Sequence, residues 1–205
     1  MIQTKRVFHG SPEKLEKYNE LCDVIAGCRK CPGLNRWNGD WNSSTLAVFG
    51  SGNLDAEIVF IGQSACKLCM KTGIPFTKGS GDFLDQCLES IGLTRKDVFI
   101  TNVVKCHPPG NRPSKKEEIE NCRPYLEQEL SIIQPKLVVT LGRDALEWFK
   151  PVKSVMDESG KVHRTLLYTL YSLPHPVVVL RRPELRDRYM KMFSRIPYIL
   201  KEVSG

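Results

Sequence analysis

The chain has 205 residues and carries 30 Lys and Arg against 23 Asp and Glu, which gives a net charge of +7 at pH 7. This length accommodates one domain with a full hydrophobic core and excludes two large ones, so we expect a single domain over residues 1–205. No stretch approaches the roughly 18 consecutive apolar residues of a membrane helix, and the polar start has no signal-peptide core. We therefore expect a cytoplasmic protein without a membrane partner.

The charge and the cysteine content indicate two kinds of partner. Excess Lys and Arg attract phosphate backbones, although many basic proteins bind no nucleic acid. Eight cysteines in a cytoplasmic chain favour metal ligation over disulfides, because that compartment keeps thiols reduced.

The first part of the chain predicts a helix, a long loop and a strand. Ser11 and Pro12 form a helix start, and Gly27 is a natural stop, which predicts a helix over residues 12–27. Residues 28–55 are rich in Gly, Asn, Ser and Trp and are expected to form a loop, with a short strand at 46–49. The apolar run 58–61 is typical of a buried strand.

The remaining chain alternates between helical and strand patterns. A capping box of Ser114 and Glu117 predicts the start of one of these helices. The expected order is a helix over 83–91 that stops at Gly92, a strand over 98–104, the capped helix through 126, a strand over 137–141, a helix over 143–149, a strand over 166–171 and a helix over 184–196.

Strands that alternate with helices predict right-handed crossovers and a parallel sheet covered on both faces. The fold class is therefore α/β, a three-layer α/β/α sandwich with a central, mostly parallel four-stranded sheet. Ligands of such folds bind beyond the carboxyl ends of the strands. That rule directs attention to the loops after Ile61, Val103, Leu141 and Tyr171.

Two cysteine pairs have the spacing of a metal site. Cys28 and Cys31 are separated by two residues in a loop, and Cys106 and Cys122 lie on either side of a loop rich in Pro and Gly. Together they could supply four thiolates to one site, and the spacing leaves open whether zinc or an iron–sulfur cluster binds there.

The other four cysteines divide into two groups. Cys22 and Cys87 fall on apolar helical faces, where a buried thiol acts as a small hydrophobic side chain. Cys66 and Cys69 form a second pair with two residues between them, so six candidates compete for four ligand positions.

A long motif in the middle of the chain resembles a known family. Residues 101–112 read Thr-Asn-Val-Val-Lys-Cys-His-Pro-Pro-Gly-Asn-Arg, and they are followed by Pro113, Glu117, Glu118 and Cys122. This order is similar to that of the iron–sulfur uracil-DNA glycosylases, the family 4 branch. The resemblance extends over nearly the whole chain through Cys28-x-x-Cys31-Pro32, Gly73-x-Pro75-Phe76-x3-Gly79-x-Gly81, Leu141-Gly142 and His175-Pro176.

The resemblance implies a cofactor and its ligands. Members of this family hold a structural [4Fe-4S] cluster, and the matching positions are Cys28, Cys31, Cys106 and Cys122. Zinc is the alternative that the spacing leaves open. Cys66 and Cys69 are then not ligands.

The resemblance also implies a reaction, the hydrolysis of the N-glycosidic bond of uracil in DNA during base excision repair. The enzyme flips the nucleotide into a pocket, because the bond is inaccessible inside a duplex. Phe76 matches the ring that stacks on uracil, Asn102 the amide that reads its edge, and His175 the donor to its O2. Gly62 and Gln63 match the turn beside the base.

The DNA contacts implied by the resemblance are basic. The candidates for phosphate contacts are Lys105, Arg112, Arg181 and Arg182, and residues 173–180 match the loop that fills the space left by the flipped base. We expect a nucleoid-associated monomer whose partner is DNA containing uracil or another deaminated base.

The chain departs from the family pattern in the turn after the first buried strand. Gln63 stands where the family has glutamate, Ser64 follows it, Ala65 replaces a proline, and Cys69 stands where an acidic residue is usual. Glutamine can orient water but cannot take its proton. Gln63, Ser64 and His175 are the catalytic candidates, and three functions stay open: a uracil glycosylase with reduced activity, one with shifted base specificity, and a nucleic-acid-binding module with little catalysis.

Overall fold

The computed structural model describes residues 4–204, and its centre is a seven-stranded sheet in the order β1-β2-β4-β3-β5-β7-β6. Four of the strands run parallel and form the middle: β3 (Ile58–Ser64), β4 (Phe99–Val104), β5 (Leu137–Leu141) and β7 (Thr169–Leu173). This confirms the predicted α/β sandwich with a mostly parallel sheet, but the predicted number of four strands is wrong, because the described sheet has seven. Three shorter strands extend the edges: β1 (Phe8–His9), β2 (Ser51–Asn53) and β6 (Val162–Arg164).

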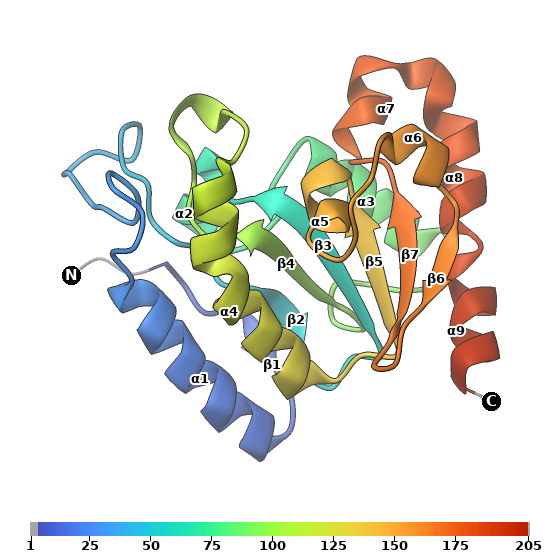
Figure 1. Ribbon diagram of the computed structural model, residues 1–205, viewed down its shortest axis with the longest axis horizontal. Coiled ribbons are helices and arrows are strands. Elements are labelled where there is room, and N and C mark those ends of the chain that lie inside the picture. Colours follow the sequence, from blue (N-terminus) through green and yellow to red (C-terminus); the bar gives the residue numbers. More distant parts are fainter. Residues whose placement is uncertain (1–3, 205) are drawn as a thin grey trace.

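Helices cover both faces of this sheet (Figure 1). One face is packed by α1 (Pro12–Gly27), α4 (Lys116–Ile133) and α5 (Arg143–Glu147). The other is packed by α3 (Ser80–Glu89), α8 (Arg186–Phe193) and α9 (Ile196–Ser204). Three short helices lie in the connections: α2 (Lys67–Thr72), α6 (Val155–Glu158) and α7 (Val177–Arg181). Within residues 4–204 no helix combines the length and apolar character needed to cross a bilayer.

The alternation of β3 shows why the sheet is buried on both sides. Val59 and Ile61 belong to the core under α1 and α4, whereas Ile58 and Phe60 belong to the core under α3 and α8. Successive side chains of a strand point to opposite faces. A continuous apolar run therefore serves both cores, as the sequence predicted.

Two predicted strands differ from the structure. Residues 46–49 are buried, but they form only an isolated bridge between Ala47 and Cys106. The last parallel strand begins at Thr169 rather than at residue 166, because Leu166 and Leu167 lie in the turn before it, with relative exposures of 103% and 82%. Apolar residues in a turn look like strand residues when only the sequence is read.

Two helix boundaries also differ. The predicted capping box of Ser114 and Glu117 is shifted by one residue, since the Glu118 carboxylate accepts a hydrogen bond from the Lys115 N–H at 2.8 Å. The predicted helix over 184–196 is two helices, α8 and α9, and Pro197 lies in the first turn of the second, where its missing N–H costs nothing.

Candidate active site and cysteine centre

The end of β3 meets the end of β4 at a glycine. The strand register pairs Gly62 with Asn102. A Cβ atom on Gly62 would lie 2.5 Å from Cζ of Phe76 and 2.6 Å from Oδ1 of Asn102, closer than real contacts allow. Only glycine therefore lets the Phe76 ring and the Asn102 amide approach the same stretch of backbone.

The Asn102 side chain is buried, and its amide has no hydrogen-bond partner among the residues that the structure describes. Its residue is 3% exposed. Buried amides are normally satisfied. The Asn102 amide thus keeps unused hydrogen-bonding capacity beside Gly62.

The backbone of Phe76 is held in an unusual conformation by Arg95 and Gly81. Phe76 has φ of 55°, a region that costs a non-glycine residue about 1–2 kcal/mol. Arg95 donates to the carbonyl oxygens of Pro75 at 2.8 Å and Phe76 at 2.7 Å. A Cβ on Gly81 would lie 1.5 Å from the same Phe76 oxygen. The turn therefore depends on Arg95 and Gly81, and of these two Arg95 belongs to no recognisable local pattern.

The His175 imidazole lies after β7, and its ring faces Phe76. The two ring centroids are 5.4 Å apart, with 22° between the planes. The Nδ1 atom of His175 accepts a hydrogen bond from the Val177 N–H at 3.1 Å. Burial, and secondly the charge of Arg181, lower the pKa of His175 to about 4. The ring is neutral near pH 7, and its single proton is on Nε2.

Gln63 and Ser64 lie in the last two positions of β3 and are partly buried. Strand alternation directs Ser64 to the same side as Gly62 and the side chain of Gln63 to the opposite side. Among the described residues the Gln63 amide has no hydrogen-bond partner. We call residues 62–66 the β3 turn.

The four basic candidates differ in their surroundings. Lys105 is 1% exposed, and its Nζ donates to Glu129 Oε2 at 2.6 Å and to the Asn102 carbonyl oxygen at 2.7 Å. Its predicted phosphate contact is therefore wrong, because the charge is buried and already paired. Arg112 is held by the Glu118 carboxylate through two hydrogen bonds, whereas Arg181 and Arg182 are exposed.

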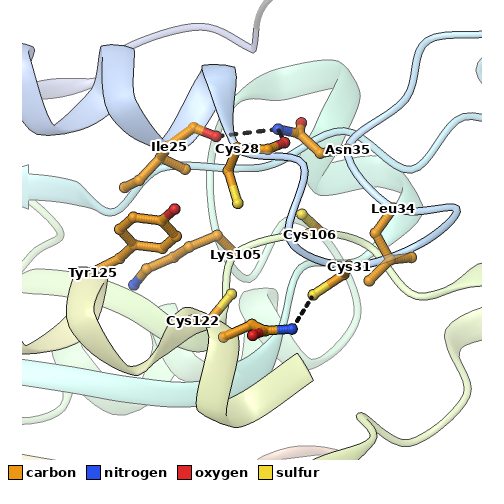
Figure 2. A pocket seen from close by; sticks show the side chains of 10 residues that line it. Ile25, Cys28, Cys31, Leu34, Asn35, Lys105, Cys106, Cys122 and Tyr125 are labelled. Carbon is orange, nitrogen blue, oxygen red and sulfur yellow. Dashed lines mark hydrogen bonds between the residues drawn. The ribbon is translucent and has the colours of Figure 1, made fainter. Parts of the chain in front are cut away.

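Four thiols meet in a second location, between the end of α1 and the start of α4. Figure 2 shows the sulfur atoms of Cys28, Cys31, Cys106 and Cys122 around one common space. All four are free cysteines. We call this group the cysteine centre.

Polar neighbours hold the loops of the cysteine centre. The Asn35 amide donates to the carbonyl oxygens of Ile25 and Cys28 at 3.1 and 3.0 Å, which ties the loop to the end of α1. The Asn121 amide lies 3.6 Å from Cys31 Sγ as a donor. Such side-chain bonds fix the backbone that carries the thiols.

The electrostatics of the cysteine centre oppose charge on the bare thiols. Burial raises the pKa of Cys122 to about 11, and burial also raises the pKa of Cys106 well above its usual value. The charges of the neighbouring cysteines raise both values further. Four thiolates here would repel one another unless a cationic group lay between them.

Four cysteines are a ligand set that both a single zinc ion and an iron–sulfur cluster use. No group of three or more His, Cys, Asp or Glu side chains within residues 4–204 is arranged to hold one metal ion. In an iron–sulfur cluster each thiolate binds its own iron, and a set of four cysteines is the usual ligand set. The residues present are compatible with such a cluster.

Cys66 and Cys69 stand apart from the cysteine centre. They are bonded to each other in a disulfide, and Cys66 is the N-cap of α2. Cys22 and Cys87 are buried in the two cores, as their positions on apolar helical faces predicted.

Comparison with known proteins gives consistent results. The model of the uracil DNA glycosylase superfamily matches residues 49–196. A type-4 uracil-DNA glycosylase of Archaeoglobus fulgidus is 36% identical over 191 residues, which cover 89% of this chain and 92% of the relative. One of Sulfurisphaera tokodaii is 36% identical over 90% of this chain and 84% of the relative. One of Thermotoga maritima is 42% identical over 66% of this chain and 69% of the relative.

Proposed function

Because this chain belongs to the uracil-DNA glycosylase superfamily, we propose that it removes uracil from DNA by hydrolysing the N-glycosidic bond. The observation that carries the proposal is the convergence of Gly62, Phe76 and Asn102, with the His175 ring stacked on Phe76. A flipped base needs an aromatic face, a polar group that reads its edge and a donor for the charge that develops. These residues supply all three.

Asn102 selects uracil over cytosine. The Asn102 amide oxygen accepts from uracil N3–H, and its NH₂ group donates to O4. Cytosine presents an acceptor at N3 and an amino donor at C4, so both interactions are lost as long as the amide keeps the orientation that places Oδ1 beside Gly62. The mismatch leaves a buried amide unpaired, which costs about 1–3 kcal/mol for each group.

His175 stabilises the leaving group. When the glycosidic bond breaks, negative charge accumulates on the uracil, and much of it is on O2. The Nε2–H group of His175 donates a hydrogen bond to this charge. The proton is on Nε2 because Nδ1 already accepts from the Val177 N–H. The ring remains neutral throughout, as its lowered pKa requires.

The attacking water is handled without a carboxylate in the β3 turn. Gln63 replaces the glutamate that is usual there, and Ser64, on the side of Gly62, orients water through its hydroxyl but does not take its proton. If the glycosidic bond breaks before water attacks, the rate depends mainly on how well the departing uracil anion is stabilised. We infer that this reaction is slower than in relatives that carry a carboxylate.

The cysteine centre is proposed to hold a [4Fe-4S] cluster through Cys28, Cys31, Cys106 and Cys122. When bound, the cluster ties together the end of α1, the loop before α4 and α4 itself. The direct neighbour of Cys106 in the chain is Lys105, which donates to the Asn102 carbonyl. The cluster therefore supports the strand end that carries Asn102.

A labelled oligonucleotide with one uracil tests the proposed function. Cluster-loaded protein is expected to produce an alkali-labile site at the uracil and none at cytosine or thymine. Parallel oligonucleotides that carry hypoxanthine test the alternative of shifted base specificity, because the divergent β3 turn lies beside the base. Binding without strand breakage for every base at high protein concentration would instead support a non-catalytic binding module.

Replacing Asn102 with aspartate is expected to change base selection. The carboxylate cannot donate to uracil O4, so uracil excision falls by about 10- to 100-fold, the equivalent of one charged hydrogen bond. Cytosine excision becomes measurable, because the carboxylate accepts from its amino group. Excision rates on two oligonucleotides, one with uracil and one with cytosine, give the ratio of uracil to cytosine excision. Asn19→Asp on α1 serves as the matched control and is expected to leave both rates unchanged. A ratio that did not move would remove Asn102 from base recognition.

Replacing Cys106 with alanine is expected to abolish most of the bound iron. The variant removes one of four thiolates from the cysteine centre, whereas Cys66→Ala removes a thiol outside it. Anaerobic purification followed by iron, zinc and sulfide analysis measures the outcome. Iron and sulfide in the wild-type protein and in Cys66→Ala, with little in Cys106→Ala, support the cluster. If the wild-type protein contained zinc and no iron, the cysteine centre would be a zinc site and not an iron–sulfur cluster.

A further inference from the structure

We propose that Cys66 and Cys69 form a reversible disulfide that acts as a redox switch of the uracil pocket, an inference that rests on the proposed glycosylase function. The disulfide joins the β3 turn to the first turn of α2. It leaves the remaining six cysteines free, four of them in the cysteine centre and two in the cores. A thiol–disulfide reaction at this pair can therefore alter the pocket while the four proposed cluster ligands stay unchanged.

The disulfide lies between two parts of the pocket. On one side are Gly62 and Ser64 at the end of β3, and on the other side α2 leads to Phe76. The path along α2 is short and well bonded: the Gly73 N–H donates to the Cys69 carbonyl at 2.8 Å, and the hydroxyls of Thr72 and Thr77 are 2.8 Å apart. A change at Cys69 is therefore passed to the backbone just before and after Phe76.

Beyond the pairing of β3 with β4, which reaches Ser64 opposite Val104, few contacts fix the β3 turn. The Met70 N–H donates to the Cys66 carbonyl at 3.2 Å. The Ala65 carbonyl is 3.2 Å from Nδ1 of His107, and the Cys69 N–H donates to Cys66 Sγ at 3.2 Å. Ala65 supplies no ring to restrict the backbone, as a proline would. The disulfide replaces that restriction with a covalent one. When it opens, the turn keeps only hydrogen bonds.

The two sulfur atoms differ in access. Cys69 is 2% exposed and packs with Leu46, Val48 and Met70, whereas Cys66 is partly exposed. The loop closed by this bond is short, so its effect on the unfolded chain is small compared with that of a long loop. Its consequence is therefore local, which fits a switch better than a global stabiliser.

The chemistry requires a dithiol reductant and a disulfide oxidant. A thiolate of the reductant attacks Cys66 Sγ, breaks the S–S bond and leaves Cys69 as thiolate, which takes a proton. The second thiol of the reductant then displaces Cys66 from the mixed disulfide. Two electrons and two protons reach the protein, and the reductant becomes a disulfide. An oxidised dithiol of the same class reverses both steps.

The oxidised form is expected to be the more active one. A covalent link keeps Ser64 and Phe76 in register with Asn102, and preorganised groups need no ordering during the reaction. Reduction is expected to lower kcat on uracil DNA by about 3- to 10-fold, less than the ~100-fold that a 1 Å misplacement costs. The affinity for exposed phosphate contacts is unchanged, since Arg181 and Arg182 lie elsewhere.

Trypsin gives a direct measure of the bond, independent of activity. It cleaves after Arg36, Lys67 and Lys71, so Cys66 and Cys69 fall on separate peptides, residues 37–67 and 68–71. Oxidised protein that has been alkylated without reduction yields the two peptides as one linked mass. Treatment with dithiothreitol before alkylation yields two alkylated peptides, and oxidised dithiothreitol restores the linked mass. Separate alkylated peptides under oxidising conditions would overturn the proposal.

Activity in the two states completes the test, with iron content measured in each sample. The Cys66→Ser/Cys69→Ser variant is expected to have the same kcat on uracil DNA as the reduced wild-type protein. Dithiothreitol is expected to leave its kcat unchanged. The matched control Cys87→Ala removes a core thiol and keeps the full response. Equal cleavage of uracil DNA by the linked and the reduced protein overturns the switch and leaves the glycosylase function in place. No cleavage by either state removes the glycosylase function, and the switch with it.

Discussion

Replacing His175 with alanine is expected to lower kcat on uracil DNA by about 10²- to 10³-fold. The variant removes the Nε2–H donor aimed at uracil O2, and the loss of one such donor in a water-excluded site has about this effect. The Val177 N–H also loses its acceptor, but Val177 is only partly buried, so water can take the place of the imidazole. Single-turnover excision rates with cluster-loaded protein measure the effect, and KM is expected to change little.

The control for this variant is His9→Ala. His9 is an exposed residue of β1 and is expected to leave the rate unchanged. The pH dependence gives a second readout: because the pKa of His175 is about 4, its neutral form is present above that value and the wild-type rate has no inflection between pH 6 and 7. An inflection near the ordinary histidine pKa of about 6.5 would mean that His175 titrates in the working range. A His175→Ala rate equal to that of wild type would remove the residue from the mechanism.

The parts of the fold that the sequence predicted are those with long apolar patterns. The run 58–61 and the run 137–141 are buried on both faces, and such patterns identify a strand whatever surrounds it. The strands β1 and β2 have two and three residues, which is too short for any period to be recognised. They form because β4 has a free edge with which the chain can pair. That pairing depends on the tertiary structure and not on the local sequence.

The same distinction applies to the candidate site. Asn102 and His175 could be named from the sequence because they lie in motifs with a fixed order. Arg95 could not, because it acts on the Phe76 carbonyl from 19 positions away and no local pattern marks it. Lys105 was assigned to DNA from its charge and its motif. Its burial depends on Glu129 in another element, which the sequence alone does not bring near.

Removing the charge of Lys105 alone is expected to destabilise the fold by about 3–5 kcal/mol. Glu129 is fully buried and accepts from Lys105 at 2.6 Å, from Thr101 at 2.8 Å and from Tyr18 at 2.8 Å. In Lys105→Met this carboxylate keeps its charge without a cation, and an uncompensated buried charge costs that amount. For a chain of this size the melting temperature falls by roughly 6–20 °C, which differential scanning calorimetry measures.

The double variant Lys105→Met/Glu129→Gln separates the charge from the packing. Glutamine is neutral and its amide oxygen still accepts from Tyr18 or Thr101, so the network keeps an acceptor without holding a charge. We expect the double variant to be more stable than Lys105→Met, by at least about 1 kcal/mol, because pairs in contact are not additive. The matched control is Lys17→Met, which breaks an exposed ion pair with Glu13 at 2.6 Å and is expected to cost under about 1 kcal/mol. If the two Lys105 variants were equally unstable, the loss would come from packing beside Cys106 and not from the unpaired charge, and iron content measured in both would show whether the cysteine centre had failed first.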